Sequence, residues 1–100
     1  TVAVYGSVTA VPLTEITIAT YTATTPILLK SAFAEGGTDG IFKLYINGTA
    51  IWTDRNAWTQ RGVQTLLEKT LASGDIVDLK VTNQKSTNHT FTGGFYVYRL

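Results

Sequence analysis

Apolar and polar residues alternate along much of the chain with a period of two, which is the period of a β-strand that buries one face. In the clearest stretch, Phe42, Leu44 and Ile46 alternate with more polar neighbours. The stretch runs into Asn47-Gly48, a dipeptide that favours a two-residue hairpin because both residues tolerate a positive φ. These residues predict an antiparallel pair of strands.

A second alternation places Val77, Leu79 and Val81 on one face of a predicted strand. It follows the polar turn at 72–75, in which Gly74 supplies the conformational freedom that a tight turn needs. We therefore expect this strand to have one buried face and one exposed face.

The last predicted strand is apolar or aromatic on both faces. Phe95 and Val97 share one face, and Tyr96 and Tyr98 share the other. Because the outer face of an antiparallel strand is usually polar, we expect both faces of this strand to be covered or to bind something. Tyr96 and Tyr98 are therefore candidates for an interface or a ligand-binding surface.

The whole pattern predicts eight strands, at residues 2–11, 15–23, 27–34, 41–47, 49–53, 63–71, 76–82 and 91–99. The stretch 63–71 also has good helix propensity, but its flanks have the pattern of strands, so we predict a strand there. Short strands separated by turns, without the spacing of strand–helix–strand units, predict an all-β fold. The expected fold class is an antiparallel, jelly-roll-like β-sandwich that forms a single domain over residues 1–100.

Composition narrows the possible functions. With 44% hydrophobic and 15% charged residues, the chain has enough apolar residues to bury a core. The formal charge is +1 and no segment is concentrated in basic residues, so nucleic acid is not an expected partner. No apolar run approaches the about 20 residues of a membrane-spanning helix, so no membrane partner is expected.

The absence of cysteine excludes disulfides, so stability must come from the core or from partner subunits.

Two segments lack the charges that usually mark a solvent-exposed strand. Residues 1–14 contain no charge, which suits an arm or edge strand that contacts a neighbour, although an ordinary first strand of the sandwich is an equal alternative. Thr17, Ala19, Tyr21 and Ala23 alternate along the second strand, and we interpret them as an uncharged outer face. Both segments suggest surfaces that are covered in an assembly.

We expect neither enzymatic activity nor a cofactor. Seven carboxylates and one histidine are spread along the chain without a motif that would gather them in a cleft. His89 lies in a polar stretch between two predicted strands, where we interpret it as a solvated loop side chain. The segment 35–40 offers two carboxylates. Calcium takes about six to eight oxygen ligands, which is more than two acidic side chains supply, so no metal site is expected.

The segment from Trp52 to Arg61 combines the residue types that concentrate at binding hot spots. Trp58, Arg55, Arg61 and Asp54 are its candidate interface or ligand-binding residues. An exposed tryptophan could stack on a sugar ring while the polar side chains bond its hydroxyls. Trp52 itself is interpreted as a core residue that continues the preceding hairpin.

Three stretches together carry a resemblance to a known group of proteins. They are the aliphatic strand 27–30, the hairpin 42–52 with its Leu-Tyr-Ile-Asn-Gly sequence, and the segment 72–83 with its Ala-Ser-Gly-Asp turn and terminal Asn83. In this order they resemble small β-sandwich structural proteins of tailed bacteriophages. The resemblance spans residues 27–98 and consists of turn and core residues, so it assigns no functional residue.

The resemblance implies a virion structural protein without enzymatic activity, either a capsid decoration or cement protein or a tail or fibre domain. Such a protein would be a homotrimer located in the virion, and in the host cytoplasm during assembly. Its partners would be copies of itself and a major capsid or tail protein. From the residues of this chain, we expect it to trimerise through apolar and aromatic strand faces and to contact the shell through residues 1–14 and the Trp58 loop. The alternative is a carbohydrate-binding module or lectin-like domain that uses the segment from Trp52 to Arg61.

Overall fold

The computed structural model describes residues 2–35, 39–56 and 62–100, without the side chains of 55–56 and 62–67. These residues form eight strands and no helix. The strands are β1 (Val2–Ala10), β2 (Glu15–Thr22), β3 (Ile27–Glu35), β4 (Gly40–Ile46), β5 (Thr49–Asn56), β6 (Gly62–Leu71), β7 (Ile76–Asn83) and β8 (His89–Arg99).

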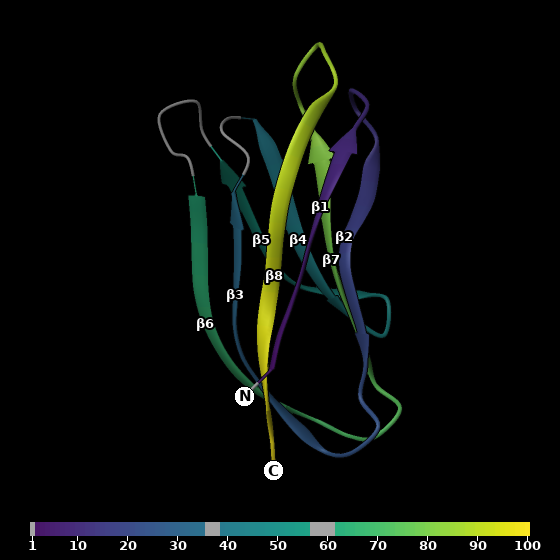
Figure 1. Cartoon of the computed structure of the whole chain (residues 1–100), viewed down its shortest axis with the longest axis vertical. Coiled ribbons are helices and arrows are strands. Elements are labelled where there is room, and N and C mark those ends of the chain that lie inside the picture. Colours follow the sequence, from purple (N-terminus) through teal and green to yellow (C-terminus); the bar gives the residue numbers. More distant parts are fainter. Residues whose placement is uncertain (1, 36–38, 57–61) are drawn as a thin grey trace.

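The strands form two facing four-stranded sheets (Figure 1), with the orders β1-β8-β3-β6 and β2-β7-β4-β5. Every pairing is antiparallel. Among strands that follow each other in the sequence, β4 and β5 are the pair that lies side by side in one sheet, joined by the predicted Asn47-Gly48 hairpin. Both hairpin residues have a positive φ. The predicted antiparallel, jelly-roll-like β-sandwich is confirmed.

The core lies between the two sheets and contains the residues that the alternation assigned to buried faces. Phe42 and Leu44 on β4 are fully buried, and so are Val77, Leu79 and Val81 on β7. Phe91 and Phe95 on β8 and Ile27 and Leu29 on β3 complete the centre of this core. The two predicted alternations are therefore confirmed.

The segment with competing helix propensity is the edge strand β6. It pairs with β3 along its length, and the register shifts between Leu29 and Ser31 of β3. Near this shift Glu68 has a φ of 50°, a left-handed conformation that is incompatible with a continuing α-helix. Sheet pairing therefore overrides the local helix propensity of this segment.

The predicted outer face of the second strand is wrong. The pairing of β2 with β7 shifts between Thr17 and Ala19, and this β-bulge reverses which residues point inward. Ala19 and Ala23 are buried, and Tyr21 packs against the core. The outward residues after the bulge are instead threonines, Thr20 and Thr22.

The last strand, β8, is central in its sheet because it pairs with β1 on one side and β3 on the other. Its Gly93-Gly94 pair permits these close approaches. A Cβ atom at Gly94 would overlap the backbone carbonyl oxygen of Val4 on β1, and one at Gly93 would lie 2.8 Å from the Phe33 carbonyl oxygen on β3. Glycine is therefore required where the strands meet most tightly.

Polar side chains fix the loops at both ends of the sandwich. At the end that holds both termini (Figure 1), Asn47 donates to Asp75 over 3.0 Å and accepts from the Ile76 amide over 2.9 Å. At the other end Asn83 is fully buried. Its side-chain amide donates to the carbonyl oxygens of Ala10 (2.8 Å) and Thr87 (2.9 Å), and its Oδ1 accepts from the Lys85 amide (2.8 Å).

Candidate interaction surface

The outer face of the sheet β2-β7-β4-β5 is polar and charged. Lys43 on β4 lies opposite Lys80 on β7, and the Lys80 ammonium lies 5.1 Å from the centre of the Tyr45 ring. The Tyr45 hydroxyl donates to the Glu15 carboxylate over 2.8 Å, and this hydrogen bond raises the pKa of Tyr45. This face has the charge pattern of a surface in contact with water.

The outer face of the sheet β1-β8-β3-β6 is aromatic instead. Tyr5 on β1 and Phe33 on β3 both lie opposite Gly94 of β8, and Tyr98 of β8 lies opposite Leu28 of β3. Residues directly opposite each other in a sheet share a face. We call this surface the aromatic face and define it by Tyr5, Leu28, Phe33, Tyr96 and Tyr98.

The rings of the aromatic face are arranged by contacts between neighbouring strands. The Phe33 and Tyr96 rings have centroids 5.4 Å apart and planes inclined by 36°, a geometry typical of favourable aromatic pairs. The Lys30 ammonium lies 6.0 Å from the Tyr98 ring centre, at the limit of a cation–π contact. The ring positions are thus set by packing between side chains.

The charge that lies within the aromatic face is paired. Lys30 forms an ion pair with Glu68 of the neighbouring strand β6. The hydrogen bond to Glu68, and then its negative charge, raise the pKa of Lys30. Because the two charges cancel, the ion pair adds no net charge to the aromatic face beside Tyr98.

Several rings of the aromatic face remain open to solvent. The exposed fraction is 70% for Tyr5, 36% for Tyr96 and 39% for Tyr98. Exposed apolar patches on a folded domain mark interaction sites, and tyrosine is enriched at binding hot spots because it buries a large area with little loss of entropy. This face is therefore suited to packing against another flat, weakly charged surface.

The candidate residues of the Trp52 to Arg61 segment are placed only in part. Trp52 lies opposite the buried Leu44 and packs against the core, which confirms its interpretation as a core-facing residue. Asp54 is partly exposed on β5. The Arg55 side chain, Trp58 and Arg61 lie outside the described residues, so the proposed sugar-binding arrangement of these side chains remains a prediction.

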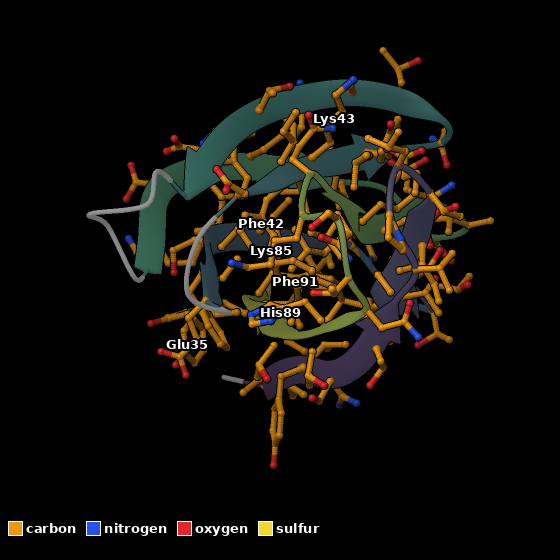
Figure 2. All side chains as sticks on the ribbon, turned by 90° about the horizontal axis from the view of Figure 1, so that it is seen from above. Glu35, Phe42, Lys43, Lys85, His89 and Phe91 are labelled. Atoms are coloured by element: carbon orange, nitrogen blue, oxygen red, sulfur yellow. The ribbon has the colours of Figure 1, made fainter. Side chains whose placement is uncertain are left out.

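The loop end opposite the termini holds His89, whose predicted place in a loop is wrong. His89 is the first residue of β8 and lies opposite Ala10. Figure 2 shows Phe91 between His89 and Phe42. The ring centres of His89 and Phe91 are 4.9 Å apart, and those of Phe42 and Phe91 are 5.8 Å apart, both in edge-to-face geometry. The histidine ring thus packs over the end of the aromatic core.

The residues that the structure describes contain neither a cluster of metal-binding side chains nor a membrane-spanning helix. No three His, Asp or Glu side chains among them are grouped as metal ligands would be. The same residues contain no helix with the length and apolar character needed to cross a membrane.

Sequence reasoning identified Tyr96 and Tyr98 but missed the other members of the aromatic face. Tyr5 was included only in the uncharged segment 1–14. Phe33 points outward between the buried Ala32 and Ala34, the reverse of the usual arrangement of large and small residues. The signal that could have revealed it is this alternation of alanine with a large aromatic residue on β3.

Comparisons with known proteins establish the fold and leave the function open. No family model and no curated protein matches the sequence. Ten chains of known structure match it. One of them, described as the crystal structure of PirA, has a TM-score of 0.57 and 11% sequence identity, covering 92% of this chain and 93% of that chain. At this level of identity the similarity shows a shared β-sandwich fold and transfers no residue roles.

Proposed function

We propose that the chain is a non-enzymatic virion structural protein that packs against other protein subunits through its aromatic face. In this proposal it is a capsid decoration or cement protein, or a tail or fibre subunit. The observation that carries the proposal is the contrast between the two outer faces. One carries the charged side chains of Glu15, Lys43 and Lys80, and the other presents Tyr5, Tyr96 and Tyr98 to solvent.

The chemistry of the aromatic face favours a protein surface as its partner. Protein interfaces are enriched in aromatic residues at their centres and depleted in lysine and glutamate. The chain has no cysteine and so no disulfides of its own, and contacts with further subunits would add to the stability that its core provides. The aromatic face therefore suits a subunit that functions inside an assembly.

The resemblance of residues 27–98 to structural proteins of tailed bacteriophages supplies the setting. It leads us to propose a major capsid or tail protein as the partner, the virion as the location and the homotrimer as the oligomer. The jelly-roll sandwich supports this setting in a general way, since viral capsid and lectin domains both use it. Fold alone does not decide between them.

The proposal is tested by co-sedimentation with shells assembled from the major capsid protein of the genome that encodes this chain. The double variant Tyr96→Ala/Tyr98→Ala removes two exposed rings, and Lys43→Ala/Lys80→Ala is the matched control on the opposite outer face. If the tyrosines form a hot spot of about 2 kcal/mol, the first variant weakens binding about 30-fold. The control should retain wild-type occupancy.

A glycan array, used beside the co-sedimentation experiment, tests the alternative function. The proposal would be replaced by a carbohydrate-binding function if the wild-type protein bound neither shells nor tails but bound a glycan array, and if the Trp58→Ala variant lost that binding. Equal shell occupancy for the tyrosine and lysine variants would show that the aromatic face is not the contact surface.

A further inference from the structure

The first strand is an unguarded sheet edge. β1 and β6 are the outer strands of one sheet, and β2 and β5 are those of the other. The nine residues of β1 carry no charge and no proline. Its register with β8 runs from the pair Val2 and Val97 to the pair Ala10 and His89 without a shift. A regular, uncharged edge is a template for a further strand.

The other three edges carry features that discourage strand addition. β2 has Glu15 and a register shift after Thr17. β6 has Glu68 and Lys69, and its pairing with β3 is also shifted. The pairing of β5 with β4 shifts as well, and β5 contains Asp54. Bulges and charged residues are the usual protection of sheet edges, and in the described part of the chain β1 is the edge without either.

The strand that follows β1 does not occupy this edge. β8 is the strand to which β1 is hydrogen-bonded within its sheet. β2 lies below β1 in the facing sheet, with the Ile18 carbonyl oxygen directly under Gly6. Contact from below covers the inner face of β1 and leaves its lateral backbone groups available to another strand.

We infer that β1 pairs antiparallel with β1 of a second copy of this chain. A two-fold axis places residue i of one strand opposite residue j of the other, and j opposite i, so charges of one sign on the strand would gather in the contact without a partner of opposite sign. β1 is suited to this arrangement because its exposed side chains are all uncharged: Val2, Ala3, Tyr5, Ser7 and Thr9. A charged partner strand would find no opposite charge on this edge.

The pairing extends the surface on which the proposed function rests. Two four-stranded sheets would join through β1 into one sheet with both aromatic faces on the same side. Tyr5, which is 70% exposed at the edge of one copy, would lie near the middle of the joined surface. Antiparallel pairing of identical strands closes at two copies, so this contact forms a dimer, and the proposed homotrimer would need a different surface.

The inference is tested by analytical ultracentrifugation over a wide range of concentration. Ala3→Lys/Ser7→Lys places two charges on the exposed side of β1. Thr20→Lys/Thr22→Lys adds the same charge to exposed positions of the edge strand β2, and Ala3→Thr/Ser7→Thr alters β1 without charge. Circular dichroism and the unfolding midpoint verify that each variant is folded. Amide hydrogen exchange follows the protection of β1.

Wild-type protein should rise from 10.8 kDa to twice that mass as its concentration increases. The threonine variant and the β2 control should do the same, whereas the β1 lysine variant should stay monomeric. Amides of β1 should gain protection in the dimer. A wild-type chain that is monomeric at all concentrations, or any oligomer that the β1 lysines leave unchanged, would overturn the inference.

The test of β1 pairing and the test of the proposed function can fail independently of each other. Monomeric wild-type protein that still co-sediments with shells through the tyrosines would overturn the β1 contact and leave the proposed function standing. A β1 dimer that binds neither shells nor tails would overturn the proposed function alone.

Discussion

The buried side chain of Asn83 offers the sharpest test of how the loops are held. Asn83→Ala removes two hydrogen bonds that the amide donates, to Ala10 and Thr87, and one that it accepts from Lys85. The three bonds connect the end of β1, the end of β7 and the 84–88 loop. Their loss should loosen the whole loop end at once.

The size of the effect follows from where each partner lies. The Ala10 bond is buried, so its carbonyl oxygen would lose its partner at a cost of about 1–3 kcal/mol. The other two bonds are only partly buried, and water can replace part of their energy, at about 0.5–1 kcal/mol each. The sum is a loss of about 3 kcal/mol in the free energy of unfolding, or about 12–24 °C in Tm for a domain of this size.

Urea denaturation followed by circular dichroism would measure this loss. Asn88→Ala is the matched control, because Asn88 is an exposed asparagine of the same loop, and it should change stability by no more than about 0.5 kcal/mol. An Asn83→Ala variant as stable as this control would refute the role assigned to the side chain.

Two further predictions concern the opposite loops and the strand contacts. The hydrogen bond from Asn47, followed by that from the Ala72 amide, lowers the pKa of Asp75 below its ordinary value near 3.8. The stability that this pKa shift contributes should be complete above pH 3.8 and should be lost as the pH falls through the lower pKa of the folded state. When the urea midpoint is plotted against pH, the Asp75→Asn variant should therefore lose less stability at acid pH than wild type. Gly94→Ala should destabilise the fold by about 2 kcal/mol or more, because its Cβ would meet the backbone of Val4. A melting temperature equal to that of wild type would contradict the tight contact of β1 with β8.

Local sequence patterns predicted the strands well because each strand's periodicity depends on a single buried face. Phe42 and Leu44, like Val77 and Val81, are buried as their alternation indicates. Which residues of β2 point inward was predicted wrongly, because one bulge between Thr17 and Ala19 reverses the two faces. No residue type in that stretch identifies a bulge. The eight strands and their sandwich arrangement were therefore predictable, whereas the register irregularities were not.

The candidate surface was predictable only where it lies on one strand. Tyr96 and Tyr98 alternate with buried residues of β8, so the sequence pattern identified them. Tyr5 and Phe33 join them through pairings across many residues of chain, and a local pattern contains no information on which strands become neighbours. Phe33 was further concealed because a large aromatic side chain is normally taken as buried.

The central position of β8 has a consequence for how the molecule forms. The sheet β2-β7-β4-β5 has all its strands once residue 83 has been synthesised, whereas β1 and β3 must both wait for β8 to pair with them. Pairing between β1 and β8 is slow to form, because it closes a long loop that contains residues 11–88. Until residues 89–99 have been synthesised, β1 therefore remains an unpaired, uncharged strand. During that interval, association with a neighbouring nascent chain competes with folding.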